Sequence, residues 1–328
     1  MANTVNPATQ GTPPSDVDPN FSNQSVENCD PELCIQFLNL HRDTNYDGIA
    51  TRLNTSDVPW MSEFLRRDGL SVLTENLARF GERRDDEDAS LKCAFCIRTV
   101  LNKGVGLKFI LQKANKRLVH NILLGVQSRY TKTKIAVTEI LSALAMYSPD
   151  GHQSVISALE FYKRERGQRH RFSIIIEELE KTQSSKYKLT LVVFVNSLLV
   201  KMADTAEGRQ TREAFLELGI LDILDKLREE ECGAIVDQID YLEHLLLHDY
   251  EEEEGFDEVD GPIGTPTDKN RNTRTGQHKA DGASYKELYN SWFMDEIDAG
   301  LSSEAEAGAV FSGDSIIDDI WKRLVRET

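Results

Sequence analysis

The sequence predicts an all-α, armadillo-like helical-repeat superhelix. Apolar residues recur every three to five positions along most of the chain, long apolar helical segments return at similar intervals, and hairpin turn signals are lacking. A helix with one apolar face must bury that face against a neighbour, so stacked helices are the architecture that satisfies this pattern. We therefore expect a curved stack of helices with a long binding groove on its inner side.

A sequence pattern of two apolar helical runs on either side of a glycine appears three times. Residues 60–80 place large apolar side chains at helical spacing on both sides of Gly69, and residues 215–227 repeat this arrangement around Gly219. Residues 105–111 repeat it more loosely. Each full phrase predicts a pair of helices joined by a turn that contains the glycine.

Three longer apolar segments are the predicted inner helices, at residues 89–102, 132–147 and 186–202. Their starts lie roughly forty to fifty-five residues apart, near the period of armadillo repeats with insertions. The third segment is apolar nearly all round, which indicates burial between neighbouring helices. Residues 191–195 are rich in β-branched side chains, so a strand is the competing interpretation there.

Composition divides the chain into four segments. Residues 1–28 contain almost no large apolar side chains and are predicted to be a disordered tail, followed by the helical-repeat domain at residues 29–250. Residues 251–283 begin with an acidic run and continue with Gly, Pro, Thr and Asn, which indicates a flexible linker. Residues 284–328 regain apolar side chains and end in a predicted amphipathic helix.

This last helix carries a single apolar stripe. Its acidic residues precede its basic residues, which is the order that the helix dipole favours. A short helix is marginally stable alone in water, so we expect this one to need a surface on which to dock. The apolar residues of the stripe are Ile316, Ile317, Ile320, Trp321 and Leu324.

The chain is strongly acidic, with 55 Asp and Glu against 38 Lys and Arg and a formal net charge of −17. This balance disfavours non-specific attraction to nucleic acid or anionic lipid and favours protein partners that carry basic patches. No apolar stretch is long enough to span a bilayer, and the chain does not begin with a signal-peptide pattern. The five irregularly spaced cysteines fit reduced thiols. We expect a cytoplasmic protein.

Catalytic patterns are lacking, so we predict a binding protein and not an enzyme. The sequence has no HExxH pattern, no phosphate-binding loop and no nucleophile elbow. Cys93 and Cys96 form a CxxC inside an apolar helical segment, which favours a place in the core over a metal or redox role. His244 and His248 share a helix face but have no third ligand in the sequence. We predict no metal and no cofactor.

Several phrases, in order along the chain, resemble the diaphanous-type inhibitory domain of formins. They are residues 48–54 (GIATRLN), 60–65 (WMSEFL), 98–107 (RTVLNKGVGL), 140–144 (ILSAL), 194–198 (FVNSL) and 212–220 (REAFLELGI). Two further phrases, residues 30–35 (DPELCI) and 147–152 (YSPDGH), look similar to the inverted formins. The resemblance extends from about residue 30 to residue 254.

The resemblance implies an armadillo-repeat domain whose concave face binds the amphipathic autoregulatory helix of a formin, in cis or in trans. In many members a Rho-family GTPase binds nearby and relieves the inhibition. Basic residues precede the domain in members with a strong GTPase preference, and residues 1–28 have no such stretch. Carried over to this chain, the groove is lined by Arg98, Leu101, Asn102, Thr138, Glu139, Ser142, Val193, Asn196, Ser197 and Val200.

Asn102 and Asn196 are expected to hold the ligand's backbone or register by hydrogen bonds. The final helix faintly resembles such an autoregulatory helix and is the candidate for docking into its own groove. The sequence contains no actin-nucleating domain, so we expect regulation of actin filament assembly, indirectly and in association with the cytoskeleton. The alternative is a generic armadillo-repeat scaffold or adaptor unrelated to actin.

Overall fold

The computed structural model describes residues 26, 28–40, 45–82, 87–202, 205–247 and 315–326. The predicted linker at residues 251–283 and most of the predicted tail at residues 1–28 lie outside this range. Among the described residues there is no strand, and residues 191–195 are helical. The all-α, armadillo-like prediction is confirmed, and the alternative of a strand is wrong.

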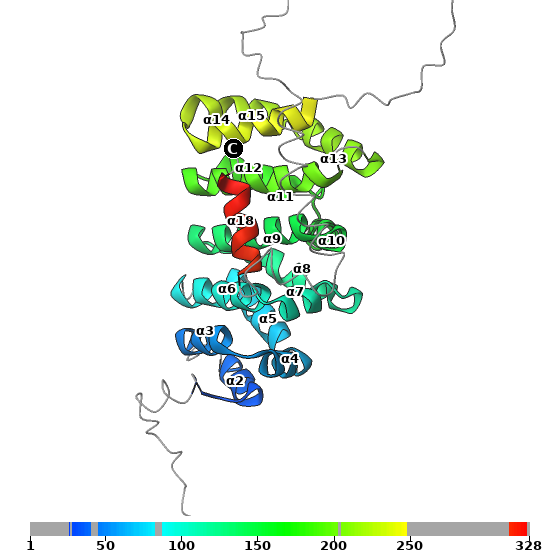
Figure 1. Cartoon of the computed structure of the whole chain (residues 1–328). Helices are drawn as coiled ribbons and strands as arrows, with labels where there is room; N and C mark the ends of the chain where they lie inside the picture. The colour runs from blue at the N-terminus through cyan, green and yellow to red at the C-terminus, as the bar shows by residue number, and fades with distance from the viewer. Residues whose placement is uncertain are drawn as a thin grey trace, which may run out of the picture.

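Short helices make up the described chain (Figure 1). In order they are α2 (Pro31–Leu38), α3 (Tyr46–Thr55), α4 (Val58–Arg66), α5 (Gly69–Glu82), α6 (Glu87–Leu101), α7 (Gly104–Ile110), η2 (Lys113–Asn115), α8 (Lys116–Leu124), η3 (Gly125–Gln127), α9 (Thr131–Tyr147), α10 (Pro149–Arg166), α11 (Ser173–Lys181), α12 (Ser185–Leu199), η4 (Val200–Met202), α13 (Ala206–Glu217), α14 (Ile220–Glu230), α15 (Ala234–Leu247) and α18 (Ile316–Arg326).

Five helices form a ladder in which each packs on the next, namely α3, α6, α9, α12 and α15 (Figure 1). They begin at residues 46, 87, 131, 185 and 234, so their starts lie 41, 44, 54 and 49 residues apart. The middle three coincide with the predicted inner helices. The first and fifth extend the ladder beyond the sequence prediction, because the shorter apolar runs of α3 and α15 gave weaker signals.

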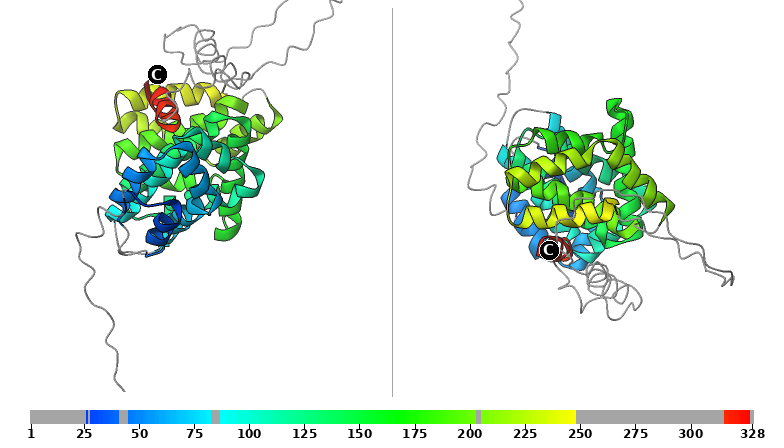
Figure 2. Two further views of the ribbon diagram at one scale, coloured as in Figure 1. Left: turned by 60° about the horizontal axis from the view of Figure 1, so that its bottom comes forward. Right: turned by 90° about the horizontal axis from the view of Figure 1, so that it is seen from above.

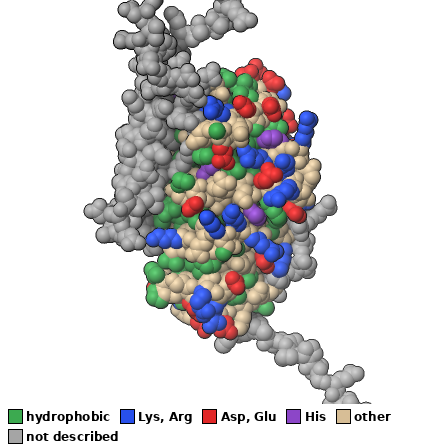
Figure 3. Space-filling view, turned by 90° about the vertical axis from the view of Figure 1, so that its right-hand side faces the viewer, with side chains coloured by type: hydrophobic (Ala, Val, Ile, Leu, Met, Phe, Trp, Pro, Cys, Tyr) green, Lys and Arg blue, Asp and Glu red, His purple; other side chains and the backbone are tan. Residues whose placement is uncertain are grey.

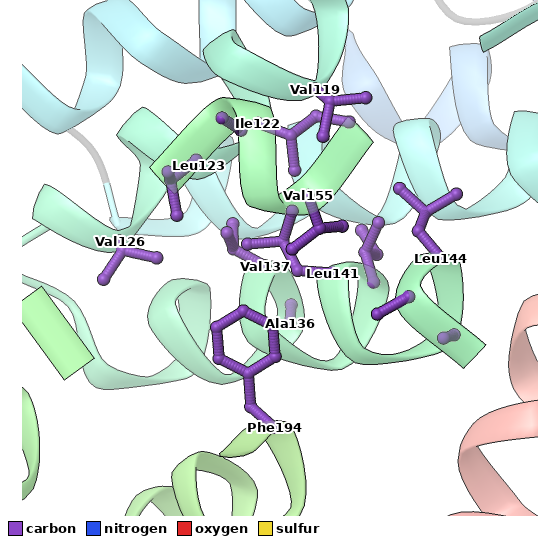
Figure 4. Close-up of a cluster of buried hydrophobic side chains, with 14 of the residues drawn as sticks. Val119, Ile122, Leu123, Val126, Ala136, Val137, Leu141, Leu144, Val155 and Phe194 are labelled. Atoms are coloured by element: carbon purple, nitrogen blue, oxygen red, sulfur yellow. The ribbon is translucent and has the colours of Figure 1, made fainter. Parts of the chain in front are cut away.

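Several of the remaining helices pack against one side of the ladder. Around the middle repeats, α8 and α10 pack on α9, and the buried side chains between them come from all three helices. Figure 4 shows Val119, Ile122 and Val155 over Val137 of α9, with Phe194 of α12 on the opposite side. Within α12, every side chain from residue 190 to residue 199 is buried, as its all-round apolar pattern predicts.

The folded body begins earlier than the sequence indicated. Val26 falls within the predicted tail, but it is 1% exposed and lies where a Cβ atom on Gly48 would meet it. The carbonyl of Cys29 accepts hydrogen bonds from Arg52 Nε (2.9 Å) and Trp60 Nε1 (3.1 Å), which tie this segment to α3 and α4. A single valine in a polar stretch gives no periodic signal, so its burial could not be read from the pattern.

Candidate helix-binding site

The helix α18 lies across the ladder of inner helices. It packs mainly on α9 and also against α6. Figure 1 shows that α18 crosses these inner helices and does not run parallel to them. Figure 2 shows it on one side of the stack. Its 11 residues make a helix about 16 Å long. One short helix therefore contacts more than one repeat, and we call the surface that it covers the α18 face.

The apolar stripe of α18 points into the α18 face. Ile317 and Ile320 are completely buried, and Ile316 and Leu324 are less than a tenth exposed. Trp321 is partly buried and packs against the same core. A fully buried Ile or Leu side chain contributes roughly 1.5–3 kcal/mol relative to an exposed one. Burial of this stripe is thus the main favourable term in docking.

Asn102 holds the amino-terminal end of α18. Its side-chain Oδ1 accepts a hydrogen bond from the backbone N–H of Asp318 (3.0 Å), and its backbone carbonyl accepts one from Ile316 N–H (3.3 Å). The first four N–H groups of a helix have no partner within that helix. An N-cap residue usually accepts hydrogen bonds from the first N–H groups of its own helix. Asn102 does the same for α18, although it lies in a distant part of the chain.

The turn after α6 positions Asn102. Gly106 lies so close to the end of α6 that a Cβ atom at this position would be 2.1 Å from the carbonyl oxygen of Val100. The Nζ of Lys103 donates to the carbonyls of Asn54 (3.1 Å) and Ser56 (2.8 Å) at the end of α3. The glycine and the lysine together fix the turn that carries Asn102, which gives both residues a structural role within the phrase at residues 98–107.

Arg98 joins α18 to α9 through two carboxylates. Its Nη1 forms an ion pair of 2.7 Å with Glu139 Oε2, and its Nε donates to Asp318 Oδ1. The side chains of Arg98 and Glu139 are 19% and 9% exposed, so both charges are largely removed from water. Burial raises the pKa of the Glu139 carboxyl, and nearby Asp318 adds to the rise, whereas Arg98 opposes it.

The other end of α18 is held by Gln238 of α15. Its Nε2 donates to the carbonyl of Leu324 (3.0 Å), which is one of the last four carbonyls of the helix and has no partner within it. Asn196 of α12 orients Gln238, because its Nδ2 donates to Gln238 Oε1 (2.7 Å) and to the Gln238 carbonyl (3.2 Å). Both ends of α18 are thus bound by side-chain amides.

The remaining candidate groove residues lie deeper. Leu101, Val193 and Ser197 are fully buried, and the Ser197 hydroxyl donates to the carbonyl of Phe194 in its own helix. Thr138 and Ser142 are also buried and bond back to carbonyls of α9. Val200 lies partly exposed in η4. Arg98, Asn102 and Gln238 form hydrogen bonds with α18.

Sequence reasoning missed Gln238 because it missed α15 as an inner helix. The signal was present, since Ile235, Ile239 and Leu242 follow a helical spacing and α15 begins one repeat length after α12. Extending the repeat by one period would have identified α15 as an inner helix, in which Gln238 is a buried polar residue. The hydrogen bond to Leu324 joins residues 86 positions apart, and no local pattern indicates it.

The CxxC pattern lies in the hydrophobic core. Cys93 and Cys96 are completely buried in α6, and burial raises the pKa of the Cys93 thiol to about 12. His248 lies outside the described residues. In the part of the chain that the structure describes, no group of three or more His, Cys, Asp or Glu side chains could hold a metal ion. Within the same ranges no helix is long and apolar enough to cross a membrane.

These features define an armadillo-like repeat domain that holds an amphipathic helix on its inner-helix face. Comparison with protein families matches residues 15–146 to the Diaphanous GTPase-binding Domain and residues 152–265 to the Diaphanous FH3 Domain. The chain belongs to the diaphanous-type formin family. This confirms the resemblance that the sequence phrases indicated.

Curated relatives agree with this assignment. The chain is 35% identical to Inverted formin-2 of Xenopus laevis over 239 residues, which cover 72% of this chain and 22% of that protein. It is 28% identical to Disheveled-associated activator of morphogenesis 1 of Homo sapiens over 217 residues, which cover 63% of this chain and 20% of that protein. The chain therefore spans about a fifth of the length of these relatives.

Among solved structures, the fold is similar to that of E. histolytica Formin1 bound to EhRho1-GTPgammaS. The TM-score is 0.51 at 19% sequence identity, and the match covers 64% of this chain and 74% of that chain. At this identity the likeness concerns the fold, and it supports the armadillo-like architecture.

Proposed function

We propose that this chain is a formin-type regulatory module whose inner-helix face binds an amphipathic autoregulatory helix, and that α18 is such a helix bound in cis. The observation that carries the proposal is the double clamp on α18. Asn102 binds its first N–H groups and Gln238 binds one of its last carbonyls. Caps at both ends favour a helical ligand of a set register over an extended peptide.

The chemistry of the α18 face suits reversible docking of a helix. The apolar stripe supplies the free energy of docking, whereas the side-chain amides at the two ends fix register and direction. A helix on the same chain has an effective concentration near millimolar, so modest affinity is enough to keep the face occupied. A formin helix of the same pattern on another chain would compete with α18 for the face.

A peptide-binding experiment tests this function. A fluorescein-labelled peptide of residues 312–328 is titrated into the full chain and into a full chain carrying Ile317→Asp and Ile320→Asp. The variant should bind the peptide, and the unaltered chain should bind it at least 10-fold more weakly because its own helix competes. A peptide with the same two substitutions is the control. Equal affinity of both chains for the peptide would reject α18 as the occupant, and no binding to either would favour the generic scaffold.

We further propose that a Rho-family GTPase binds this module and weakens docking of α18, in a protein that acts on actin filament assembly. The support is the GTPase-binding family match over residues 15–146, a region that includes Arg98 and Asn102. Because coupling between two ligands is reciprocal, a GTPase that weakens α18 docking must bind more tightly when α18 is displaced. GTP-loaded Rho-family proteins should therefore prefer the Ile317→Asp, Ile320→Asp chain. Equal binding of GTP-loaded and GDP-loaded forms would contradict this part.

A further inference from the structure

The outer side of the stack carries a positive surface within an acidic protein. Residues 89–138 contain ten Lys and Arg and no Asp or Glu, although the whole chain has a net charge of −17. Residues 163–171 add five basic residues and one acidic residue. The second segment lies at the end of α10, which packs on α8 from the first segment. The fold therefore brings basic residues of the two segments together where α8 meets the end of α10. Other basic residues of the first segment, among them Lys92, Arg98 and Lys134, are paired with carboxylates elsewhere.

Ring and hydrogen-bond contacts show that the charged groups are neighbours. His120 of α8 stacks on Phe161 of α10 with ring centroids 4.5 Å apart. Gln127 of η3 donates to the hydroxyl of Tyr162 (3.0 Å) and accepts a hydrogen bond from Arg166. We define the α8–α10 basic surface as Lys116, Lys163, Arg164, Arg166 and Arg171, with His120 and His170 between them. Figure 3 shows basic and histidine side chains gathered around the middle of the side of the molecule on which α10 lies in Figure 1.

The positive charge of this surface is only partly neutralised. Burial lowers the pKa of His120, and the charges of Arg164 and Lys116 lower it further. Burial also lowers the pKa of His170, with Arg171 and Lys163 acting in the same direction against Glu217 and Glu160. Among the basic residues of the surface, the one ion pair within the described chain joins Lys163 to Glu160 (3.4 Å). Lys116 and Arg164 are exposed, and the Nε of Arg164 donates one long hydrogen bond to the Glu160 carbonyl (3.4 Å), so both cations are accessible to an anionic partner.

We propose that the α8–α10 basic surface binds an acidic peptide segment of a partner protein. Guanidinium groups form paired hydrogen bonds with carboxylates, and three of the five basic residues are arginines. Glu160, Glu165 and Glu217 lie beside the basic residues, so a uniformly anionic plane or duplex would meet repulsion there. An extended peptide can place its carboxylates beside the basic groups and pass between the acidic ones.

The acidic residues beside the surface favour the same partner over a membrane. A bilayer of anionic lipid acts on all charges within a Debye length of its plane, about 8–10 Å at physiological salt, and therefore also repels Glu160, Glu165 and Glu217. A short peptide meets the local field of the surface. The surface lies on α8, α10 and the residues that follow α10, whereas α18 lies on α9 and α6, so an acidic peptide and α18 can be bound together.

Fluorescence anisotropy of a labelled octaglutamate peptide with the full chain tests the proposal. We expect saturable binding at 50 mM salt that weakens about 10-fold at 300 mM. Arg164→Glu and, independently, Lys116→Glu should each weaken it at least 5-fold. Lys226→Glu is the matched control, because Lys226 is exposed on α14 and the substitution changes the net charge equally. The control should change the affinity less than 2-fold.

Two results would overturn the proposal. One is an equal loss in Arg164→Glu and Lys226→Glu, which would show an effect of net charge without a site. The other is binding to vesicles with 30% anionic lipid, or to a 20-nucleotide single-stranded DNA, without binding to octaglutamate. Hydrogen exchange of residues 316–326 should be the same in Arg164→Glu and the unaltered chain. This readout separates failure of this proposal from failure of the proposed α18 docking.

Discussion

Replacement of Asn102 by Ala should loosen α18 without disturbing the repeats beneath it. The substitution removes the Oδ1 atom that accepts the N–H of Asp318 at 3.0 Å, whereas the backbone carbonyl that accepts the N–H of Ile316 remains. Loss of a capping side chain costs about 1 kcal/mol, with a range of roughly 0.5–2 kcal/mol. The equilibrium constant for docking should therefore fall by about 5-fold, and by at most about 30-fold.

Hydrogen exchange followed by mass spectrometry measures this change in the intact chain. The amides of residues 316–326 exchange when α18 leaves the face, so their protection reports the docking equilibrium. We expect protection of this segment to fall about 5-fold in Asn102→Ala, with protection of α12 and α15 unchanged. Asn121→Ala is the matched control, because Asn121 is a buried asparagine of α8 that bonds to Thr74 and does not contact α18. Unchanged protection of residues 316–326 in Asn102→Ala would refute the capping argument.

Four further variants test other parts of the α18 face. Gln238→Ala should lower protection of residues 316–326 about 3-fold to 10-fold in the same assay, because the Leu324 carbonyl loses its hydrogen-bond donor. Asn196→Ala should lower protection less, because Asn196 only orients Gln238. Loss of protection in Asn196→Ala but not in Gln238→Ala would contradict these two roles. Ile317→Asp with Ile320→Asp should abolish protection of α18, since two fully buried side chains at roughly 1.5–3 kcal/mol each are lost, and persistent protection would rule out the docked stripe. Glu139→Gln should strengthen docking about 2-fold to 5-fold, because Asp318 then has Arg98 to itself; weaker docking would show that Glu139 supports the helix. Because the pKa of Glu139 is raised in the folded state, the stability that its protonated form contributes is lost as the pH rises from 4.5 through the folded-state pKa. The urea midpoint of the unaltered chain should therefore fall from about pH 4.5 upward relative to that of Glu139→Gln.

The repeated helices could be predicted from the sequence because each repeat contains its own pattern of apolar residues. Gly69 between two apolar helical runs predicts α4 and α5, but the turn itself falls one step earlier, at Arg67 and Asp68, and Gly69 is the first residue of α5. The long apolar runs predict α9 and α12 because no solvent-exposed helix tolerates so many apolar side chains. The terminal stripe likewise predicts α18, since its apolar residues repeat at helical spacing.

The contacts that make the α18 face depend on residues that are distant in the sequence. Asn102 and Asp318 are 216 positions apart, so only the resemblance to the formins drew attention to Asn102. Nothing near Gln238 marks it as a cap, because its role depends on Asn196 orienting it from one side and Leu324 accepting its hydrogen bond on the other. Helix ends can be predicted locally only when the capping residue is also local.

The balance of charges around Arg98 supports the proposed reversible docking of α18. Arg98 is one cation between two carboxylates, so docking of α18 brings Asp318 toward a pair that already contains Glu139. The Coulomb gain from Arg98 is offset in part by repulsion from Glu139, and both buried groups have lost water. The Arg98–Asp318 ion pair therefore contributes more to the orientation of α18 than to its affinity. The buried apolar stripe contributes affinity but does not set the orientation. A partner that withdraws Arg98 from Asp318 would leave two carboxylates facing each other and drive the helix off its face.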